Sequence, residues 1–265
     1  MHLNPLIRPR RIGISLIVLL VLLAGVWMVV PRSAQAIKIE QMHWEHTAVT
    51  VITVDLSQAD FRLFWRDSTQ QLYRQFGVLR DDLAKQGLSL RFAMNAGMYH
   101  ADRQPVGLLV QQGQLKNPLN TAQGDGNFFL QPNGVFAVDQ AGQALLEPTA
   151  RFASRDPSAL RWATQSGPML LVDGEINPIF DPQSSAKRIR NAVGRIDATH
   201  VVFVISAQPI RFYDLASLFK ERLGCTDALY LDGSISALYS STDAQPRQRE
   251  DFGVMLGVVE PNTAP

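Results

Sequence analysis

The chain has 265 residues, of which 46% are hydrophobic and 18% are charged, and its formal net charge is +1. This balance excludes the intrinsically disordered class, whose chains combine low hydrophobicity with high net charge. The single cysteine, Cys225, excludes an intrachain disulfide and a multi-cysteine zinc site. No histidine pair has the His-Glu-x-x-His spacing of a catalytic zinc site, so we predict neither a metal nor another cofactor.

The first 36 residues are predicted to direct export. Three arginines, Arg8, Arg10 and Arg11, precede an uncharged run of 19 residues from 12 to 30, and Ala34-Gln35-Ala36 follows. A basic head, an apolar centre and a small-residue Ala-x-Ala site are typical of a secretory signal peptide. The run is also just long enough to span a bilayer as a helix, so an uncleaved anchor in the inner membrane is the alternative.

Both alternatives place residues 37–265 outside the cytoplasm, because the positive residues stay on the cytoplasmic side. We therefore expect a periplasmic or other extracytoplasmic location. The leader carries four basic and no acidic side chains, which leaves 21 basic and 24 acidic residues and a net charge of −3. Residues 37–265 are mildly acidic and contain no stripe of basic residues, which argues against nucleic acid as a partner.

The rest of the chain shows no linker, repeat or charge block, so we predict one domain after the leader. Residues 47–56 are β-branched and apolar and predict a strand, with residues 61–65 as its expected hairpin partner. Residues 77–86 have the spacing of a helix, and residues 90–96 predict a further strand.

Hairpins are expected in the middle of the chain, because Gly-containing pairs between apolar runs favour tight turns. The expected turns are Gln112-Gly113 after residues 106–111, Pro132-Asn133-Gly134 between residues 127–131 and 135–139, and Asp173-Gly174 after residues 162–172.

The last third combines short strands with a helix. Residues 201–206, 228–231 and 253–259 are apolar and predict buried strands. Residues 213–223 predict an amphipathic helix. Many strands and two main helices predict an α+β fold with a mixed, mostly antiparallel sheet.

Asp232 is the most informative polar residue. It follows the apolar residues 228–231 directly, so we expect it at the edge of the sheet. Gly233 permits a tight turn and a close approach of the backbone to a ligand. A carboxylate held there has the chemistry of a general base, a nucleophile or a ligand of sugar hydroxyls. The alternative is an Asp-Gly turn with a purely structural role.

Two further strand ends carry polar residues. Arg188 and Arg190 are two positions apart and face the same way in an extended segment, where their guanidinium groups suit a phosphate or carboxylate. Solvated loop arginines are the alternative. Asn95 either binds a sugar or forms the turn before Gly97. Ser166 lies in Gln-Ser-Gly and not in Gly-x-Ser-x-Gly, which disfavours a serine-hydrolase triad.

Four motifs occur in a fixed order along the chain: Asn95-Ala96-Gly97-Met98-Tyr99, Gln165-Ser166-Gly167-Pro168-Met169-Leu170 with Asp173-Gly174, Arg190-Asn191-Ala192-Val193-Gly194, and Leu231-Asp232-Gly233-Ser234-Ile235-Ser236. Taken together, they resemble the phosphodiester glycosidase domain family, in particular its bacterial envelope branch, over about residues 47–259. The resemblance implies an α+β domain that hydrolyses the bond between a sugar's anomeric carbon and a phosphodiester, in an envelope glycan or a related metabolite.

The resemblance also implies roles for individual residues. Arg190, helped by Arg188, would bind the phosphate, Asp232 would act on the anomeric carbon as base or nucleophile, and Asn95 would orient a sugar hydroxyl. Ile235 would narrow the approach to a ligand, because it stands with Ser234 where a characterised member has glycines. Further expected substrate contacts are Gly97, Gln165, Ser166, Gly233 and Ser234.

A glycosidase usually needs two carboxyl groups. Asp102, Asp125 and Glu175 are candidates for the second, and Asp102 is preferred because it follows the turn at residues 95–99. The competing function is a non-catalytic envelope protein that binds phosphodiester-linked glycans through the same arginines and Asn95. The expected partner in both cases is a sugar phosphate or a glycan.

Overall fold

The computed structural model describes residues 2, 36–232, 235–242 and 248–262. The chain divides into two units, Met1–Arg32 and Ser33–Pro265, and the fold described below belongs to the second. The predicted leader, with its apolar run at residues 12–30, lies outside the described residues except for His2 and Ala36. No helix in the described part of the chain is long and apolar enough to cross a membrane.

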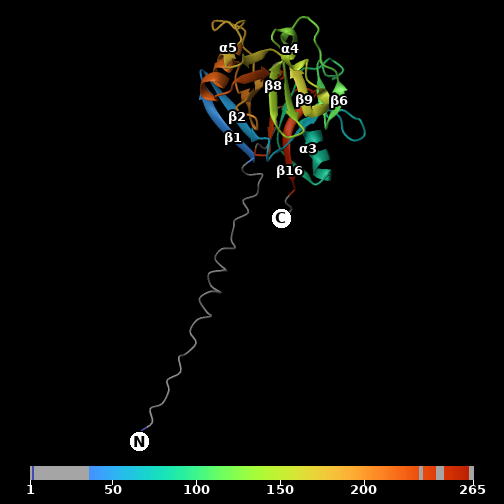
Figure 1. Cartoon of the computed structure of the whole chain (residues 1–265). Helices are drawn as coiled ribbons and strands as arrows, with labels where there is room; N and C mark the ends of the chain where they lie inside the picture. The colour runs from blue at the N-terminus through green and yellow to red at the C-terminus, as the bar shows by residue number, and fades with distance from the viewer. Residues whose placement is uncertain (1, 3–35, 233–234, 243–247, 263–265) are drawn as a thin grey trace. The chain divides into compact units, whose positions relative to one another are not determined.

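The largest sheet has seven strands, and every pair of neighbouring strands in it is antiparallel. Figure 1 shows β1 and β2 in blue at one side of this unit and β6 in green at the other. In spatial order the strands are β1 (Ile37–Trp44), β2 (Thr47–Asp55), β13 (His200–Ser206), β12 (Asn191–Arg195), β14 (Asp227–Tyr230), β10 (Met169–Val172) and β11 (Glu175–Ile176).

Two smaller antiparallel sheets contain the remaining named strands. One contains β15 (Leu238–Ser240), β4 (Leu88–Asn95), β16 (Met255–Pro261) and β3 (Asp60–Phe64), in that order. The other contains β6 (Gln114–Asn117), β5 (Leu109–Gln111), β9 (Leu160–Ser166), β7 (Gly134–Asp139) and β8 (Ala144–Pro148).

The helices are few and peripheral to the sheets. In α3 (Phe76–Lys85), Phe76, Leu79 and Leu83 are buried at helical spacing, which gives the helix one apolar face. The other helices are α4 (Thr149–Phe152), α5 (Phe212–Ser217) with its π-helical continuation η3 (Leu218–Arg222), and the 3-10 turns η1 (Asn127–Phe129) and η2 (Pro157–Ala159). The predicted α+β class and the mostly antiparallel pairing are confirmed.

An aromatic cluster joins the three sheets. Phe203 of β13 lies 5.9 Å from Phe61 of β3 and 5.8 Å from Phe136 of β7, measured between ring centroids. Phe92 of β4 is 5.6 Å from the same ring of Phe203. These rings are buried in one apolar cluster, and aromatic pairs at such distances add to the free energy of apolar burial. The cluster therefore fixes the sheets against one another.

Two predicted turns are confirmed. Gln112 and Gly113 both have positive φ, as do Asp173 and Gly174. Two consecutive residues with positive φ form the tight turn that matches the twist of a hairpin. These turns close the hairpins β5–β6 and β10–β11.

The expected hairpin between residues 47–56 and 61–65 is wrong. Strand β2 pairs with β1 and β13, whereas β3 pairs with β16 in another sheet. The apolar side chain of Phe61 packs into the cluster between the sheets, which separates the two strands despite their short connection.

The expected strand at residues 127–131 is also wrong. Asn127–Phe129 is a single 3-10 turn, and β7 pairs instead with β8 and β9. The side chain of Asn133 donates to the carbonyl oxygen of Phe128 at 3.0 Å, which folds this segment back on itself.

Candidate active site

Two buried asparagines join the ends of three strands. Asn95 ends β4 and Asn191 begins β12, and both side chains are 0% exposed. The Nδ2 of Asn191 donates to the carbonyl oxygen and the Oδ1 of Asn95, at 2.8 and 3.2 Å. This pair is positioned beside the segment that leaves β14.

The asparagine pair holds the backbone of Asp232 from two sides. Asn95 Nδ2 donates to the Asp232 carbonyl oxygen at 3.1 Å, and Asn191 Oδ1 accepts from the Asp232 N–H at 3.1 Å. The Oδ1 of Asn95 also accepts from the N–H of Ala237 at 3.0 Å, beyond the turn. A backbone bound at both its donor and its acceptor has little freedom. Asp232 is thus held in a defined position, and it is 9% exposed.

The carboxylate of Asp232 lies within electrostatic reach of two tyrosines. Burial and then the charge of Asp232 raise the pKa of Tyr99. Burial raises the pKa of Tyr230 to about 12, with Asp232 adding to the shift and Arg190 opposing it. A negative charge raises the pKa of a nearby phenol because it disfavours the phenolate. Tyr230, 1% exposed, therefore lies within electrostatic reach of both Asp232 and Arg190.

Arg190 is a buried cation whose hydrogen bonds are incomplete. It is 2% exposed, its Nε donates to the Ile210 carbonyl oxygen at 2.9 Å and its Nη2 donates to that of Ala186 at 3.2 Å. Its Cζ lies 3.6 Å from the ring centroid of Phe212 and 5.3 Å from that of Tyr230. Its Nη1 has no hydrogen-bond partner among the described residues.

Burial lowers the pKa of Arg190, but a guanidinium keeps its proton in proteins. No ion pair in the described part of the chain includes it. A buried polar group without a partner costs free energy, so Nη1 is suited to an anionic ligand. Arg188 is exposed and two residues away, and its charge further lowers the pKa of Arg190.

Gly97 and Ser166 tie a third strand to the same region. A Cβ on Gly97 would lie 2.3 Å from the carbonyl oxygen of Gln165, so β9 requires a glycine there. The hydroxyl of Ser166 donates to the carbonyl oxygen of Leu231, the residue before Asp232. Gly97 therefore permits the close approach of β9, and Ser166 holds the segment that carries Asp232.

The side chain of Gln165 is directed to a different region. Its Oε1 accepts from the N–H groups of Leu108 and Asn120 at 3.0 and 2.9 Å, and its Nε2 donates to the Asn120 carbonyl oxygen at 2.7 Å. Gln165 and Ser166 are neighbours in a strand, so their side chains point to opposite faces.

The predicted residues Gly233 and Ser234 lie outside the described residues, whereas Ile235 packs against the apolar cluster around Phe76.

The three residues predicted to supply the second carboxyl group are all exposed. Asp102 is exposed and its Oδ1 accepts from the N–H of Gln104 at 3.0 Å, within a turn. Glu175 forms an exposed ion pair with Lys220 at 2.9 Å. Asp125 is exposed as well.

Sequence reasoning missed a further carboxylate, Glu250. Its charge raises the pKa of Tyr99, the same phenol on which Asp232 acts. Asp251 has a similar effect, but its carboxylate accepts from Gln75 at 3.0 Å. Glu250 is exposed, and no signal in the sequence connects it with residue 232. Its charge therefore acts on the same phenol as that of Asp232.

Asn191 and Tyr230 were also missed as site residues. Asn191 follows Arg190 directly, so its place at the start of a strand was a usable signal. Tyr230 looked like an ordinary strand residue, and only its contact with the Arg190 side chain distinguishes it.

Neither a metal cluster nor a reactive thiol is found at this site. No group of three or more His, Cys, Asp or Glu side chains with metal-binding geometry occurs in the described ranges. Cys225 is buried, and burial raises the pKa of its thiol to about 12.

Comparison with known proteins identifies relatives. The chain is 37% identical over 212 residues to the uncharacterised protein YigE of Escherichia coli (strain K12), covering 79% of this chain and 81% of YigE. The catalytic domain of zebrafish N-acetylglucosamine-1-phosphodiester α-N-acetylglucosaminidase, auto-inhibited by its pro-peptide, has a similar fold. That likeness has a TM-score of 0.58 and 12% identity, over 84% of this chain and 81% of the zebrafish domain.

A hypothetical protein from Synechocystis shares the fold as well, with a TM-score of 0.54 and 14% identity, over 85% of this chain and 62% of that protein. At such identities these two structures support the fold alone. The sequence model of the phosphodiester glycosidase family, in contrast, matches residues 89–259, which include both asparagines, Arg190 and Asp232. The chain therefore belongs to the phosphodiester glycosidase family.

Proposed function

We propose that this protein is an exported hydrolase that cleaves the bond between a sugar's anomeric carbon and a phosphodiester, in an envelope glycan or a related metabolite. The observation that carries the proposal is that Arg190 lies 5.3 Å from the ring centroid of Tyr230, two residues before Asp232, whose charge raises the pKa of the Tyr230 phenol. A carboxylate and a guanidinium with one unsatisfied donor among the described residues suit the two halves of such a substrate. Membership of the family supports the same reaction class.

Arg190 is assigned to the phosphate. Its Nη1 lacks a partner among the described residues, and a phosphate oxygen would satisfy this buried donor. The guanidinium is held by the carbonyl oxygens of Ile210 and Ala186 and by the ring of Phe212, so little side-chain entropy is lost on binding. Arg188 adds positive charge from the surface.

Asp232 is assigned to the anomeric carbon. The bond between this carbon and the phosphate oxygen breaks, and its electron pair leaves with the phosphate, which is a good leaving group without protonation. Asp232 either accepts the proton of a water that adds to the carbon or bonds to the carbon itself until water releases the sugar. Asn95 is buried and bound within the protein, so we assign it, with Asn191, to the positioning of Asp232.

The second carboxyl group is assigned to Asp102 or to Glu250. Asp102 follows the turn at residues 95–99, and Glu250 shares Tyr99 with Asp232. The variants Asp102→Asn and Glu250→Gln separate these assignments. The variant that removes the second catalytic carboxyl group should lose sugar release at every pH, and the other variant should keep it.

Export is part of the proposal and is supported by the basic, apolar and small-residue order of residues 1–36. Fractionation of cells that express the full chain tests it. Recovery of the chain from the cytoplasm would contradict export.

The principal test is Asp232→Asn in the full chain, incubated with a panel of glycosyl phosphodiesters and assayed for free reducing sugar. Loss of a general base or nucleophile should lower the rate by about 10²–10⁴-fold. Asp81→Asn, an exposed carboxylate paired with Arg80 on α3, is the matched control and should leave the rate unchanged. Wild-type turnover by Asp232→Asn would remove Asp232 from the mechanism.

The competing function is a non-catalytic protein that binds phosphodiester-linked glycans. It is favoured by the state of Asp102, which is exposed and accepts from the N–H of Gln104 within its own turn, because a binding protein needs no second carboxyl group. Binding of the panel without release of sugar would support this second function and refute the hydrolase.

A further inference from the structure

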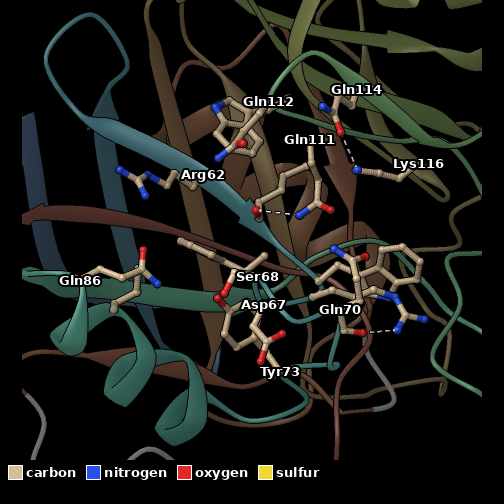
Figure 2. A pocket seen from close by; sticks show the side chains of 16 residues that line it. Arg62, Asp67, Ser68, Gln70, Tyr73, Gln86, Gln111, Gln112, Gln114 and Lys116 are labelled. Atoms are coloured by element: carbon tan, nitrogen blue, oxygen red, sulfur yellow. Dashed lines mark hydrogen bonds between the residues drawn. The ribbon is translucent and has the colours of Figure 1, made fainter.

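A pocket whose lining excludes the Asp232 turn lies between β3, the segment after it, α3 and the β5–β6 hairpin. Its volume is about 360 Å³. Figure 2 shows Arg62 and Gln112 on one side of this pocket, Gln114 and Lys116 on another, and Asp67 with Ser68 across from them. Neither Asp232 nor Arg190 lines it, so its chemistry is separate from that of the candidate active site.

The pocket carries excess positive charge. Arg62 is paired with Asp60 at 2.6 Å, but neither Arg66 nor Lys116 has a carboxylate partner among the described residues. Asp67 is the acidic residue of the lining. Its Oδ1 already accepts from Thr69 and from the N–H of Gln71, all within its own turn.

This charge is notable because residues 37–265 carry a net charge of −3. Two cations without carboxylate partners at the rim of a concave surface favour an anionic group in the ligand. The amino group of Lys116 donates to Gln114 Oε1 at 2.7 Å and the Nη1 of Arg66 to the Gln70 carbonyl oxygen at 2.7 Å. Both cations keep further donors for a ligand.

The remaining polar lining is rich in carboxamides. Five glutamines contribute to it, and a carboxamide both donates and accepts hydrogen bonds, as a sugar hydroxyl does. Trp162 also lines the pocket; it is 3% exposed, and its Nε1 has no hydrogen-bond partner among the described residues. Such a buried donor is normally satisfied, and a hydroxyl or anionic oxygen in the pocket would satisfy it.

The pocket is connected to the candidate active site through the turn at residues 99–105. Trp65, in the pocket lining, donates from Nε1 to the Arg103 carbonyl oxygen at 3.0 Å. The guanidinium carbon of Arg103 lies 5.3 Å from the ring centroid of Tyr99, whose phenol is in reach of Asp232.

We propose that this pocket binds an anionic carbohydrate, with Lys116 and Arg66 on its negative group and the carboxamides and Trp162 on its hydroxyls. A volume of about 360 Å³ accommodates a short segment, on the order of two sugar rings, given the usual size of ligand pockets. The inference does not depend on catalysis at Asp232.

The test is isothermal titration of the full chain with four probes: maltose, maltose 6′-phosphate, digalacturonate and inorganic phosphate. We expect at least one of the two charged sugars to bind about 10-fold or more tightly than maltose, because a hydrogen bond to a charged group contributes about 1.5–3 kcal/mol and 1.4 kcal/mol is tenfold. Lys116→Gln and Arg66→Gln should each weaken that binding about 10-fold and leave sugar release unchanged. Lys38→Gln, an exposed lysine of β1, is the matched control and should not alter binding.

Three results would overturn the proposal. Failure of both charged sugars to bind would exclude an anionic carbohydrate. Binding of inorganic phosphate as tight as that of the sugars would reduce the pocket to a simple anion site. Unchanged affinity in Lys116→Gln and Arg66→Gln would place the ligand elsewhere. Because sugar release is measured separately, each of these results is distinct from a failure of the proposed hydrolase.

Discussion

Asn191→Ala is the substitution that tests the architecture of the site most directly. The asparagine side chain, which is buried, donates to Asn95 and accepts from the Asp232 N–H and from the Ser236 hydroxyl. Alanine removes all of these interactions at once without adding bulk. The variant therefore tests whether the asparagine pair positions the backbone of Asp232.

The magnitude follows from what is left behind. An unsatisfied buried N–H at Asp232 costs about 1–3 kcal/mol, and each net hydrogen bond lost to Asn95 costs about 0.5–1.5 kcal/mol. With two such bonds to Asn95, we expect the free energy of unfolding to fall by about 2–6 kcal/mol in total. For a domain of this size each kcal/mol shifts Tm by about 2–4 °C, so Tm should fall on the order of 10 °C. Sugar release should fall as well, because Asp232 is no longer held.

The assay pairs thermal unfolding with sugar release below the Tm of the variant. Asn117→Ala is the matched control, since Asn117 Nδ2 donates to the carbonyl oxygens of Pro105 and Gly107 at 3.1 and 2.7 Å, away from Asp232. That variant should lose stability and keep its rate per folded molecule. If Asn191→Ala melted within about 1 °C of the wild type and kept its rate, the asparagine pair would have no role in positioning Asp232.

Three further predictions concern charged groups. Arg190→Lys should weaken substrate binding much more than Arg188→Lys, because lysine lacks the planar fork of the buried guanidinium; equal KM values in the two variants would contradict this. The Cys225 thiol, with its pKa raised to about 12, should react with a disulfide reagent at pH 8 only after denaturant is added, and an immediate reaction of the native chain would refute its burial. The hydrogen bonds from the N–H of Thr199 and from His200 lower the pKa of Asp197 to about 2 from 3.8. Its contribution to stability is therefore present above about pH 4 and is lost as pH falls towards 2, so the urea midpoints of wild type and Asp197→Ala should converge over that interval.

Much of the local structure could be predicted from the sequence because local energetics decide it. The Gln112-Gly113 and Asp173-Gly174 turns follow from residues that tolerate positive φ, and α3 follows from apolar residues at helical spacing. Pairing between strands was harder. Strand β3 pairs with β16, nearly two hundred residues later, because its aromatic side chain is buried between sheets.

Part of the candidate site could be proposed from the sequence, and the roles of its residues stay predictions. Asp232, Arg190 and Asn95 were identified because motifs in the sequence resemble those of a known family, and the family match includes all three. The contacts of Asn191 with Asn95 and Asp232, and the position of Tyr230 beside Arg190, join residues from strands far apart in the chain. No local pattern records such contacts.

The sequence by itself determined the α+β class, the tight turns, the family and the residues that carry charge near the site. Only the tertiary structure decided which of those residues meet, and it set the burial that leaves Arg190 with an unsatisfied donor and Cys225 as a protonated thiol. The physical reason is that backbone propensity acts between neighbours in sequence, whereas burial and electrostatic reach depend on distance in space.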